Sequence, residues 1–116
     1  MVVTFNHVEI PVLDLNKAKE FYETIFNWTV DLESYPNYGF VMLENDFSLG
    51  FFKVEKIPEI GINVVFGIEN IDDTLKNIND SGGKTHRDKY HIAPEVGYAA
   101  EFLDCFGNRL GLHSRN

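Results

Sequence analysis

The fold of this chain is decided by Phe5-Asn6-His7-Val8-Glu9-Ile10-Pro11-Val12, in which every second residue from Val8 onward is aliphatic. A period of two predicts a strand with one buried face. Asp14 follows, and aspartate favours a helix N-terminus because its carboxylate accepts hydrogen bonds from backbone N–H groups. Apolar residues at helical spacing come next: Leu15, Ala18, Tyr22 and Ile25. The sequence therefore predicts a strand that leads into an amphipathic helix.

The same pattern recurs 56 residues further along the chain. Residues 62–68 form the second strand candidate, Asn70 stands where Asp14 stood, and Gly82-Gly83 ends the helix. The apolar stripe of this second helix consists of Ile71, Leu75 and Ile78. An internal repeat restricts the possible folds, because each half must build the same supersecondary unit.

Extended segments separated by turn residues follow each helix. In the first half they are residues 28–32, 39–43 and 47–52. In the second half they are residues 84–87, 98–103 and 109–113. The last segments of the two halves are offset by 61 residues instead of 56, so we expect a longer loop in the second half, over residues 88–96. Each half is predicted to be a βαβββ module, residues 1–56 and 57–116.

One module alone would bury little surface, because it has one helix and a sheet whose other face is uncovered. We therefore expect the modules to pair. The short linker, Glu55-Lys56-Ile57-Pro58-Glu59, allows the two modules of one chain to pair with each other or with those of a second chain. We expect a homodimer, and the sequence leaves both arrangements open.

Composition and charge restrict the partners. The chain is 44% hydrophobic and 24% charged, as expected of a folded domain, and its net charge is −8. Residues 1–56 carry −5 and residues 57–116 carry −3, so neither half offers the basic face that phosphate backbones require. We expect no nucleic-acid partner and no membrane partner. A small organic ligand remains the expected partner.

The same features indicate a cytoplasmic protein. No run approaches the roughly 20 apolar residues that a membrane span needs, and no basic segment opens the chain. Cys105 is the single cysteine, which suits a reducing compartment. It reads as a turn residue, because no nearby motif supplies an activating base.

The sequence resembles the vicinal oxygen chelate superfamily, which contains glyoxalase I, the bleomycin-resistance proteins and the extradiol dioxygenases. The resemblance rests on residues 7–14 leading into residues 18–28, with Phe21-Tyr22 inside the helix, and on residues 104–114 at the end. Phe26-Asn27-Trp28 and the Gly-Leu-His-Ser ending are similar to a bacterial group related to lactoylglutathione lyase. The resemblance implies an α+β fold in which the two βαβββ modules form a cupped, partly open, eight-stranded barrel-like sheet with the helices outside.

The resemblance also implies where a metal ion would bind. Enzymes of the glyoxalase I type hold a divalent cation in the cup through a His on the first strand of each module and a Glu on the last. The corresponding positions here are His7, Asn63, Gly50 and Gly111. Glycine offers no side chain and an amide is a poor ligand for a transition metal. We therefore expect no inherited metal site and no cofactor, and glyoxalase I activity is disfavoured.

Strand alternation predicts which residues face the cup. Val8, Ile10 and Val12 should pack on the helix, which turns His7 and Glu9 to the concave side. Glu101 faces the cup if Ala100 and Phe102 pack on the second helix. The predicted ligand-binding residues are His7, Glu9, Gly50, Phe52, Asn63, Val65, Glu101, Gly111 and His113. The catalytic candidates among them are Glu9, His7 and Glu101.

This set supports three interpretations. It is a rebuilt metal site, an acid/base pair with Glu9 or Glu101 as base and His7 or His113 as partner, or a binding site whose polar groups orient a ligand. Gly50 and Gly111 would leave room for a small molecule. The basic residues of segment 84–91 would form a loop at the mouth. Nucleophilic catalysis lacks support, because no serine of the chain has an obvious base: Ser34, Ser48, Ser81 and Ser114. We favour a binding protein, with a lyase or isomerase as the alternative.

Overall fold

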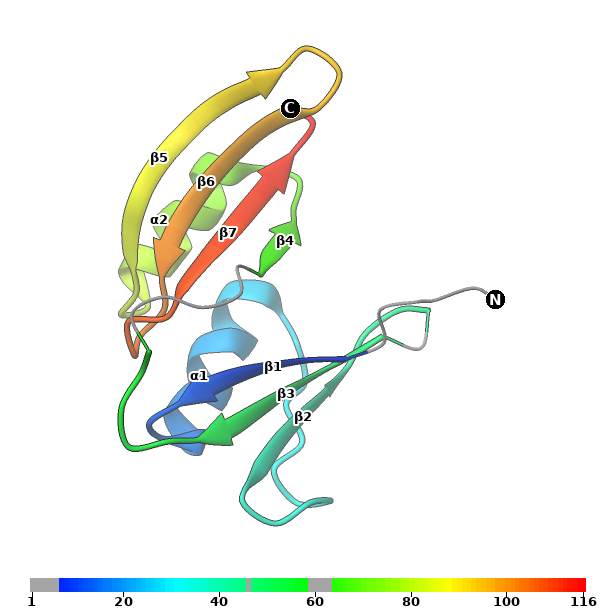
Figure 1. Ribbon diagram of the computed structural model, residues 1–116, viewed down its shortest axis with the longest axis vertical. Coiled ribbons are helices and arrows are strands. Elements are labelled where there is room, and N and C mark those ends of the chain that lie inside the picture. Colours follow the sequence, from blue (N-terminus) through cyan, green and yellow to red (C-terminus); the bar gives the residue numbers. More distant parts are fainter. Residues whose placement is uncertain (1–6, 46, 59–63) are drawn as a thin grey trace. The chain divides into compact units, whose positions relative to one another are not determined.

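The computed structural model describes residues 7–45, 47–58 and 64–116. The chain divides into two compact units, Met1–Ile57 and Pro58–Asn116. Each unit has one helix and one sheet, in the order strand, helix, then further strands (Figure 1). The predicted α+β class is confirmed.

The first unit holds a three-stranded sheet with a helix on one face. Its elements are β1 (His7–Val12), α1 (Leu15–Phe26), β2 (Tyr38–Met42) and β3 (Ser48–Lys53). The strand order is β1-β3-β2, with β3 parallel to β1 and antiparallel to β2. The core consists of side chains from the strands and the helix: Ile10, Val12, Ala18, Phe21, Tyr22, Ile25, Val41, Leu49 and Phe51.

Helix α1 begins where its sequence predicts, and an asparagine ends it. The Asp14 carboxylate accepts a hydrogen bond from the Lys17 N–H at 3.0 Å, as an N-cap does. Asn27 closes the helix in the left-handed conformation, with φ 57°, and its N–H donates to the Glu23 carbonyl.

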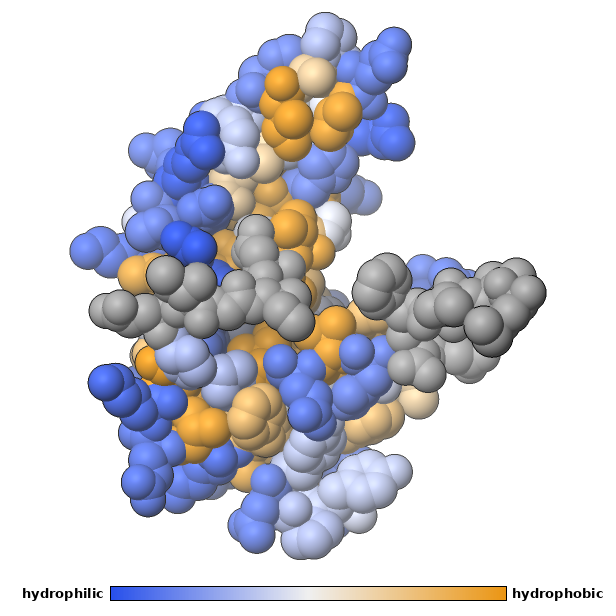
Figure 2. Space-filling view, in the orientation of Figure 1, coloured by the Kyte–Doolittle hydropathy of each residue, from blue (hydrophilic) through white to orange (hydrophobic). Residues whose placement is uncertain are grey.

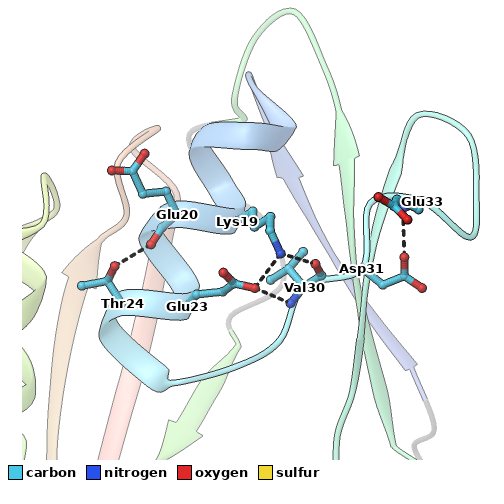
Figure 3. A network of polar contacts seen from close by, with 7 residues as sticks. All are labelled: Lys19, Glu20, Glu23, Thr24, Val30, Asp31 and Glu33. Atoms are coloured by element: carbon cyan, nitrogen blue, oxygen red, sulfur yellow. Dashed lines mark hydrogen bonds and ion pairs between the residues drawn. The ribbon is translucent and has the colours of Figure 1, made fainter.

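Residues 28–32 do not form the predicted strand, and only an isolated bridge joins Asp31 to Phe40. The reason lies in the backbone of Val30, whose polar groups bond to side chains of α1 (Figure 3). The Val30 N–H donates to Glu23 Oε2 at 2.8 Å, and its carbonyl accepts from Lys19 Nζ at 2.7 Å. The part of the chain that the structure describes therefore has seven named strands instead of eight.

The same contacts stabilise the ionised form of the Glu23 carboxyl. The hydrogen bond from Lys19 Nζ, at 2.7 Å, lowers the pKa of the Glu23 carboxyl, and the bond from the Val30 N–H lowers it further. The carboxylate thus stays charged and holds the segment after α1 against the helix.

The second unit repeats this plan with a longer sheet. Its elements are β4 (Val65–Gly67), α2 (Ile71–Asp80), β5 (Lys84–Ala93), β6 (Gly97–Leu103) and β7 (Arg109–Ser114). The strand order is β4-β7-β6-β5, and only the β4–β7 pair is parallel. The core consists of Ile71, Leu75, Ile78, Ala100, Phe102, Leu110 and Leu112.

The predicted ends of α2 are confirmed. Asn70 Oδ1 accepts from the Asp73 N–H at 2.9 Å. Gly82 takes φ 102°, and the Gly83 N–H donates to the Ile78 carbonyl at 2.9 Å. A side chain at Gly82 would be strained in this conformation, which explains the glycine.

The predicted loop over residues 88–96 is wrong. Strand β5 continues to Ala93, and the extra residues lengthen its hairpin with β6 (Figure 1). The basic residues expected at the mouth of a cup therefore lie on an edge strand, where charge opposes pairing with another chain. Arg87 stacks over the Tyr90 ring, with 3.5 Å from Cζ to the centroid.

Apolar side chains gather near the tip of this hairpin (Figure 2), where Ile92 and Val96 are each 43% exposed.

The turn between β6 and β7 is held by Asp104, whose carboxylate accepts hydrogen bonds from the Phe106 and Asn108 N–H groups and from Asn108 Nδ2, each at 2.9 Å. Within the described residues, neither helix is long and apolar enough to span a membrane.

Candidate functional site

The face of the first sheet opposite α1 carries the polar residues that the sequence singles out. Ile10 and Val12 are buried, so the alternate residues His7 and Glu9 lie on the other face of β1. The register places Ser48 opposite His7 and Gly50 opposite Glu9. We call this surface the open face of the first sheet. Three aromatic side chains share this face: Phe52 on β3, and Tyr38 and Phe40 on β2. Phe52 is the register partner of Pro11 on β1, and on β2 Tyr38 pairs with Phe52 and Phe40 with Gly50.

Four side chains on the open face form one hydrogen-bonded cluster, which we call the His7 cluster: His7, Glu9, Tyr38 and Ser48. His7 Nδ1 lies 2.7 Å from Ser48 Oγ, and His7 Nε2 lies 2.7 Å from the Tyr38 hydroxyl oxygen. The Tyr38 hydroxyl donates to Glu9 Oε2 at 2.8 Å. The same carboxylate oxygen is 3.5 Å from His7 Nε2. Three strands thus contribute to one continuous chain of hydrogen bonds.

The donors in this chain can be assigned by counting protons. A tyrosine hydroxyl has one proton, and that of Tyr38 goes to Glu9, so His7 Nε2 must donate to the Tyr38 oxygen. In neutral His7 the other ring nitrogen, Nδ1, is then an acceptor, and the Ser48 hydroxyl donates to it. The proton order therefore runs from Ser48 through His7 and Tyr38 to Glu9.

Tyr38 lies across the glycine at position 50. A Cβ added to Gly50 would lie 2.8 Å from Cε2 of Tyr38 and nearer still to its Cζ and hydroxyl oxygen. Gly50 therefore gives the phenol its space, and any larger residue would displace it. The room expected over Gly50 for a ligand is taken by this ring.

Burial and neighbouring charge keep Tyr38 protonated. Desolvation, the hydrogen bond to Glu9 and the negative charge of Glu9 raise the pKa of Tyr38 to about 12, in that order of size. His7 and Glu9 remain accessible, with side chains 33% and 49% exposed. The His7 ring also stacks near Phe40, with 6.5 Å between centroids. The cluster is thus a half-exposed polar site with an aromatic side.

The structure brings together some of the predicted residues and adds two others. His7 and Glu9 lie in one cluster, with Gly50 beside them and Phe52 on the same face. Ser48 was expected to lack a base, and this is wrong, because its hydroxyl is hydrogen-bonded to His7 Nδ1 at 2.7 Å. The sequence contained a signal for Ser48, since it lies two residues before Gly50 and therefore on the same face of the strand.

In the second unit, Glu101 and His113 have separate partners. Ala100 and Phe102 are buried, and Glu101 lies on the opposite face, as the alternation predicts. Its Oε1 is 3.8 Å from His86 Nε2. His113 Nε2 donates to the Val96 carbonyl at 2.6 Å.

Val65 lies beside Gly111 and fills part of the space predicted for a ligand. The two residues are register partners, and a Cβ added to Gly111 would lie 3.0 Å from Cγ2 of Val65. Val65 itself is 53% exposed, so its methyl groups remain available to an apolar ligand. Asn63 lies outside the described residues.

The comparisons with known proteins fit this architecture. Residues 4–112 match the model of the Glyoxalase/Bleomycin resistance protein/Dioxygenase superfamily. The chain belongs to this superfamily. A glyoxylase-like domain-containing protein of Didymella fabae is 25% identical, over 93% of this chain and 91% of that protein.

Solved structures share the fold. FosX, a fosfomycin resistance protein of Listeria monocytogenes solved with Mn(II) and sulfate, has a TM-score of 0.79 at 19% identity, over 100% of this chain and 93% of that one. A glyoxalase/bleomycin resistance protein/dioxygenase family enzyme of Burkholderia phytofirmans PsJN has a TM-score of 0.79 at 16% identity, over 96% and 98%. At such identities the likeness concerns the fold alone.

The residues present do not fit the metal site that the superfamily resemblance implies. At position 50 the place of a ligating side chain is taken by the Tyr38 phenol, whose proton is engaged with Glu9. At Gly111, Val65 occupies the adjoining space. Among residues 7–45, 47–58 and 64–116, no three His, Cys, Asp or Glu side chains are grouped so that they could hold an ion.

Proposed function

We propose that this protein is a small-molecule-binding member of the superfamily that works without the metal site of the glyoxalase I type. The observation that carries the proposal is the Tyr38 phenol over Gly50, where the resemblance would place a ligating carboxylate. The phenol connects His7 to Glu9 through hydrogen bonds of 2.7 and 2.8 Å. A polar network that satisfies itself holds its side chains in place without an ion.

The chemistry of the His7 cluster supports a small oxygenated ligand. Glu9 is half exposed and has acceptor capacity beyond its bond from Tyr38, so it can accept from a ligand hydroxyl or N–H group. Phe40 and Phe52 on the same face offer apolar contact beside these polar groups. Pockets for small molecules combine the same two elements, a few placed polar groups and an apolar wall.

The second module contributes further binding residues in this proposal: Asn63, Val65, Glu101, Gly111 and His113. We propose that the protein acts as a cytoplasmic homodimer. We also propose that it belongs to the bacterial group related to lactoylglutathione lyase. A mutant of FosX from Listeria monocytogenes has been solved with Mn(II) and 1S,2S-dihydroxypropylphosphonic acid. Here the ligand would be held by side chains alone.

Calorimetry on chelator-treated protein tests the binding proposal. The probes are metal-free bleomycin and fosfomycin, each titrated into the wild type and into His7→Ala. The proposal expects one probe to bind the metal-depleted wild type and to lose affinity by about tenfold or more in His7→Ala, a cost of about 1.4 kcal/mol. Lys76→Ala is the control, since Lys76 pairs with Asp80 on α2 of the second unit. Binding that appears only when a divalent ion is added would contradict the proposal.

A lyase or isomerase is the second candidate, with Glu9 or Glu101 as base and His7 or His113 as partner. It is favoured by the half-exposed Glu9 carboxylate, whose Oε2 lies 3.5 Å from His7 Nε2, because a base and an imidazole that can carry the proton then stand together on one accessible face. Thioester formation from the hemithioacetal of methylglyoxal and glutathione tests it. Turnover that disappears in Glu9→Gln would establish this activity and replace the binding proposal.

A further inference from the structure

Ser48 and His7 have the geometry of a nucleophile and its base. The two residues face each other across the parallel β1–β3 pair, and Ser48 Oγ is 2.7 Å from His7 Nδ1. A serine hydroxyl is a weak nucleophile unless an adjacent base takes its proton. The distance lies within the range in which such a proton transfer occurs.

The remainder of the His7 cluster orients the base. Because the single Tyr38 proton goes to Glu9, the proton on His7 sits at Nε2 and the Nδ1 lone pair faces the Ser48 hydroxyl. When Nδ1 gains a proton, the imidazolium charge is stabilised through Tyr38 by the Glu9 carboxylate, whose Oε2 is 3.5 Å from Nε2. A nucleophile, a base and an orienting group together form the arrangement on which covalent catalysis depends.

We propose that Ser48 is a nucleophile activated by His7, with Tyr38 and Glu9 as positioning residues, and that the cluster transfers acyl groups from small activated esters. The Ser48 Oγ forms a bond to the ester carbonyl carbon while its proton passes to His7 Nδ1. The bond from that carbon to the leaving oxygen breaks, and the leaving oxygen takes the proton from His7. Water then attacks the acyl group, gives a proton to His7, and releases a carboxylic acid as Ser48 Oγ recovers its proton.

This activity uses residues of the proposed binding site but does not depend on the binding proposal. The His7 side chain is 33% exposed, so a small ester can approach the Ser48–His7 pair from the open face. The positioning roles of Tyr38 and Glu9 predict a separate effect on Ser48. Tyr38→Phe keeps the ring over Gly50 yet removes the hydroxyl that links His7 to Glu9, so it should slow Ser48 while the fold is kept.

Covalent labelling by an alkyl fluorophosphonate is the test. Ser48 Oγ would bond to phosphorus and displace fluoride, which leaves one adduct that intact-mass and peptide mass spectrometry locate. We expect the adduct at Ser48 in the wild type, its loss in Ser48→Ala, and labelling slower by about 100-fold or more in His7→Gln. Ser34→Ala is the matched control, because Ser34 lies beside the Asp31 carboxylate instead of an imidazole, and it should label as the wild type does. An adduct elsewhere, no adduct, or equal rates in wild type and His7→Gln would overturn the proposal.

A second variant measures the same activation with another nucleophile. In Ser48→Cys, iodoacetamide should alkylate position 48 at least tenfold faster than Cys105, the chain's single native cysteine, and Tyr38→Phe in the same background should remove most of the difference. Equal alkylation of the two thiols would overturn the activation by His7, since a purely structural His7 gives no rate advantage. Labelling that fails while a probe still binds the chelator-treated protein would reject this inference alone.

Discussion

Gly50 provides the sharpest test of the open face, through a double-mutant cycle with Tyr38. In the wild-type background, Gly50→Ala places a Cβ 2.8 Å from Tyr38 Cε2 and closer to its hydroxyl, so the ring must leave its position. The ring then loses its hydrogen bonds to His7 and Glu9, at 2.7 and 2.8 Å. In Tyr38→Ala the obstacle is absent, and the same substitution should be harmless.

The magnitude follows from the contacts. Two hydrogen bonds, one of them to a carboxylate, contribute about 2–3 kcal/mol together, and the exposure of Glu9 brings the expected loss to about 2 kcal/mol. Replacing a strand glycine by alanine is itself favourable by about 0.5–1 kcal/mol. Gly50→Ala should therefore destabilise the wild type by about 1–1.5 kcal/mol and stabilise Tyr38→Ala by about 0.5–1 kcal/mol. The coupling energy is about 2 kcal/mol.

Urea unfolding followed by circular dichroism measures the four free energies of unfolding. Gly67→Ala is the matched control, because a Cβ at Gly67 meets no atom within 4 Å, and it should have the same small effect in both backgrounds. If Gly50→Ala changes the free energy of unfolding equally with and without Tyr38, the phenol does not lie over Gly50 and the reasoning fails.

Three further predictions concern titration and local contacts. The pKa of Tyr38 is about 12 in the folded protein, against 10.0 for a free tyrosine, so its contribution to stability is present below pH 10 and is lost as the pH rises toward 12. Glu9→Gln should lower the Tyr38 pKa in a tyrosinate absorbance titration. An unchanged pKa would remove Glu9 as a cause. Asp104→Ala leaves the Phe106 and Asn108 N–H groups without their acceptor and should cost about 2–4 kcal/mol in urea unfolding, whereas a loss under about 0.5 kcal/mol would contradict the turn. Lys19→Met should raise the pKa of Glu23 in a carbon-detected NMR titration and speed exchange of the Val30 amide; unchanged exchange would show that Lys19 does not hold this segment.

Local signals in the sequence predicted the helices well. Asp14 and Asn70 cap the two helices through their side chains, and Gly82 takes the positive φ that its position requires. These features act over a few residues, so a short stretch of sequence contains the whole cause. The alternation along β1 and β6 likewise predicted the faces of Glu9 and Glu101.

The predictions for residues 28–32 and 88–96 were wrong because groups elsewhere in the chain bond to these segments. Residues 28–32 have the composition of a strand, but Glu23 and Lys19 on α1 bond to the backbone of Val30. The extension of β5 to Ala93 depends on its pairing with β6, which composition does not reveal. In both cases the deciding partner lies elsewhere in the chain, and local propensity could not weigh it.

The candidate site was predicted in part for the same reason. His7 and Glu9 follow from alternation along one strand, whereas Tyr38 enters the cluster from β2 and depends on the register with β3. Ser48 joins it through the parallel pairing of β1 with β3. A sequence that shows glycines at positions 50 and 111 indicates missing ligands, but it does not indicate that a phenol and a valine take their space.

The metal content of protein purified without chelator tests the central claim most directly. Elemental analysis of the wild type and of His7→Ala should find Ni, Zn, Mn and Fe far below one ion per chain in both proteins. One equivalent of a divalent metal in the wild type that is absent from His7→Ala would contradict the account.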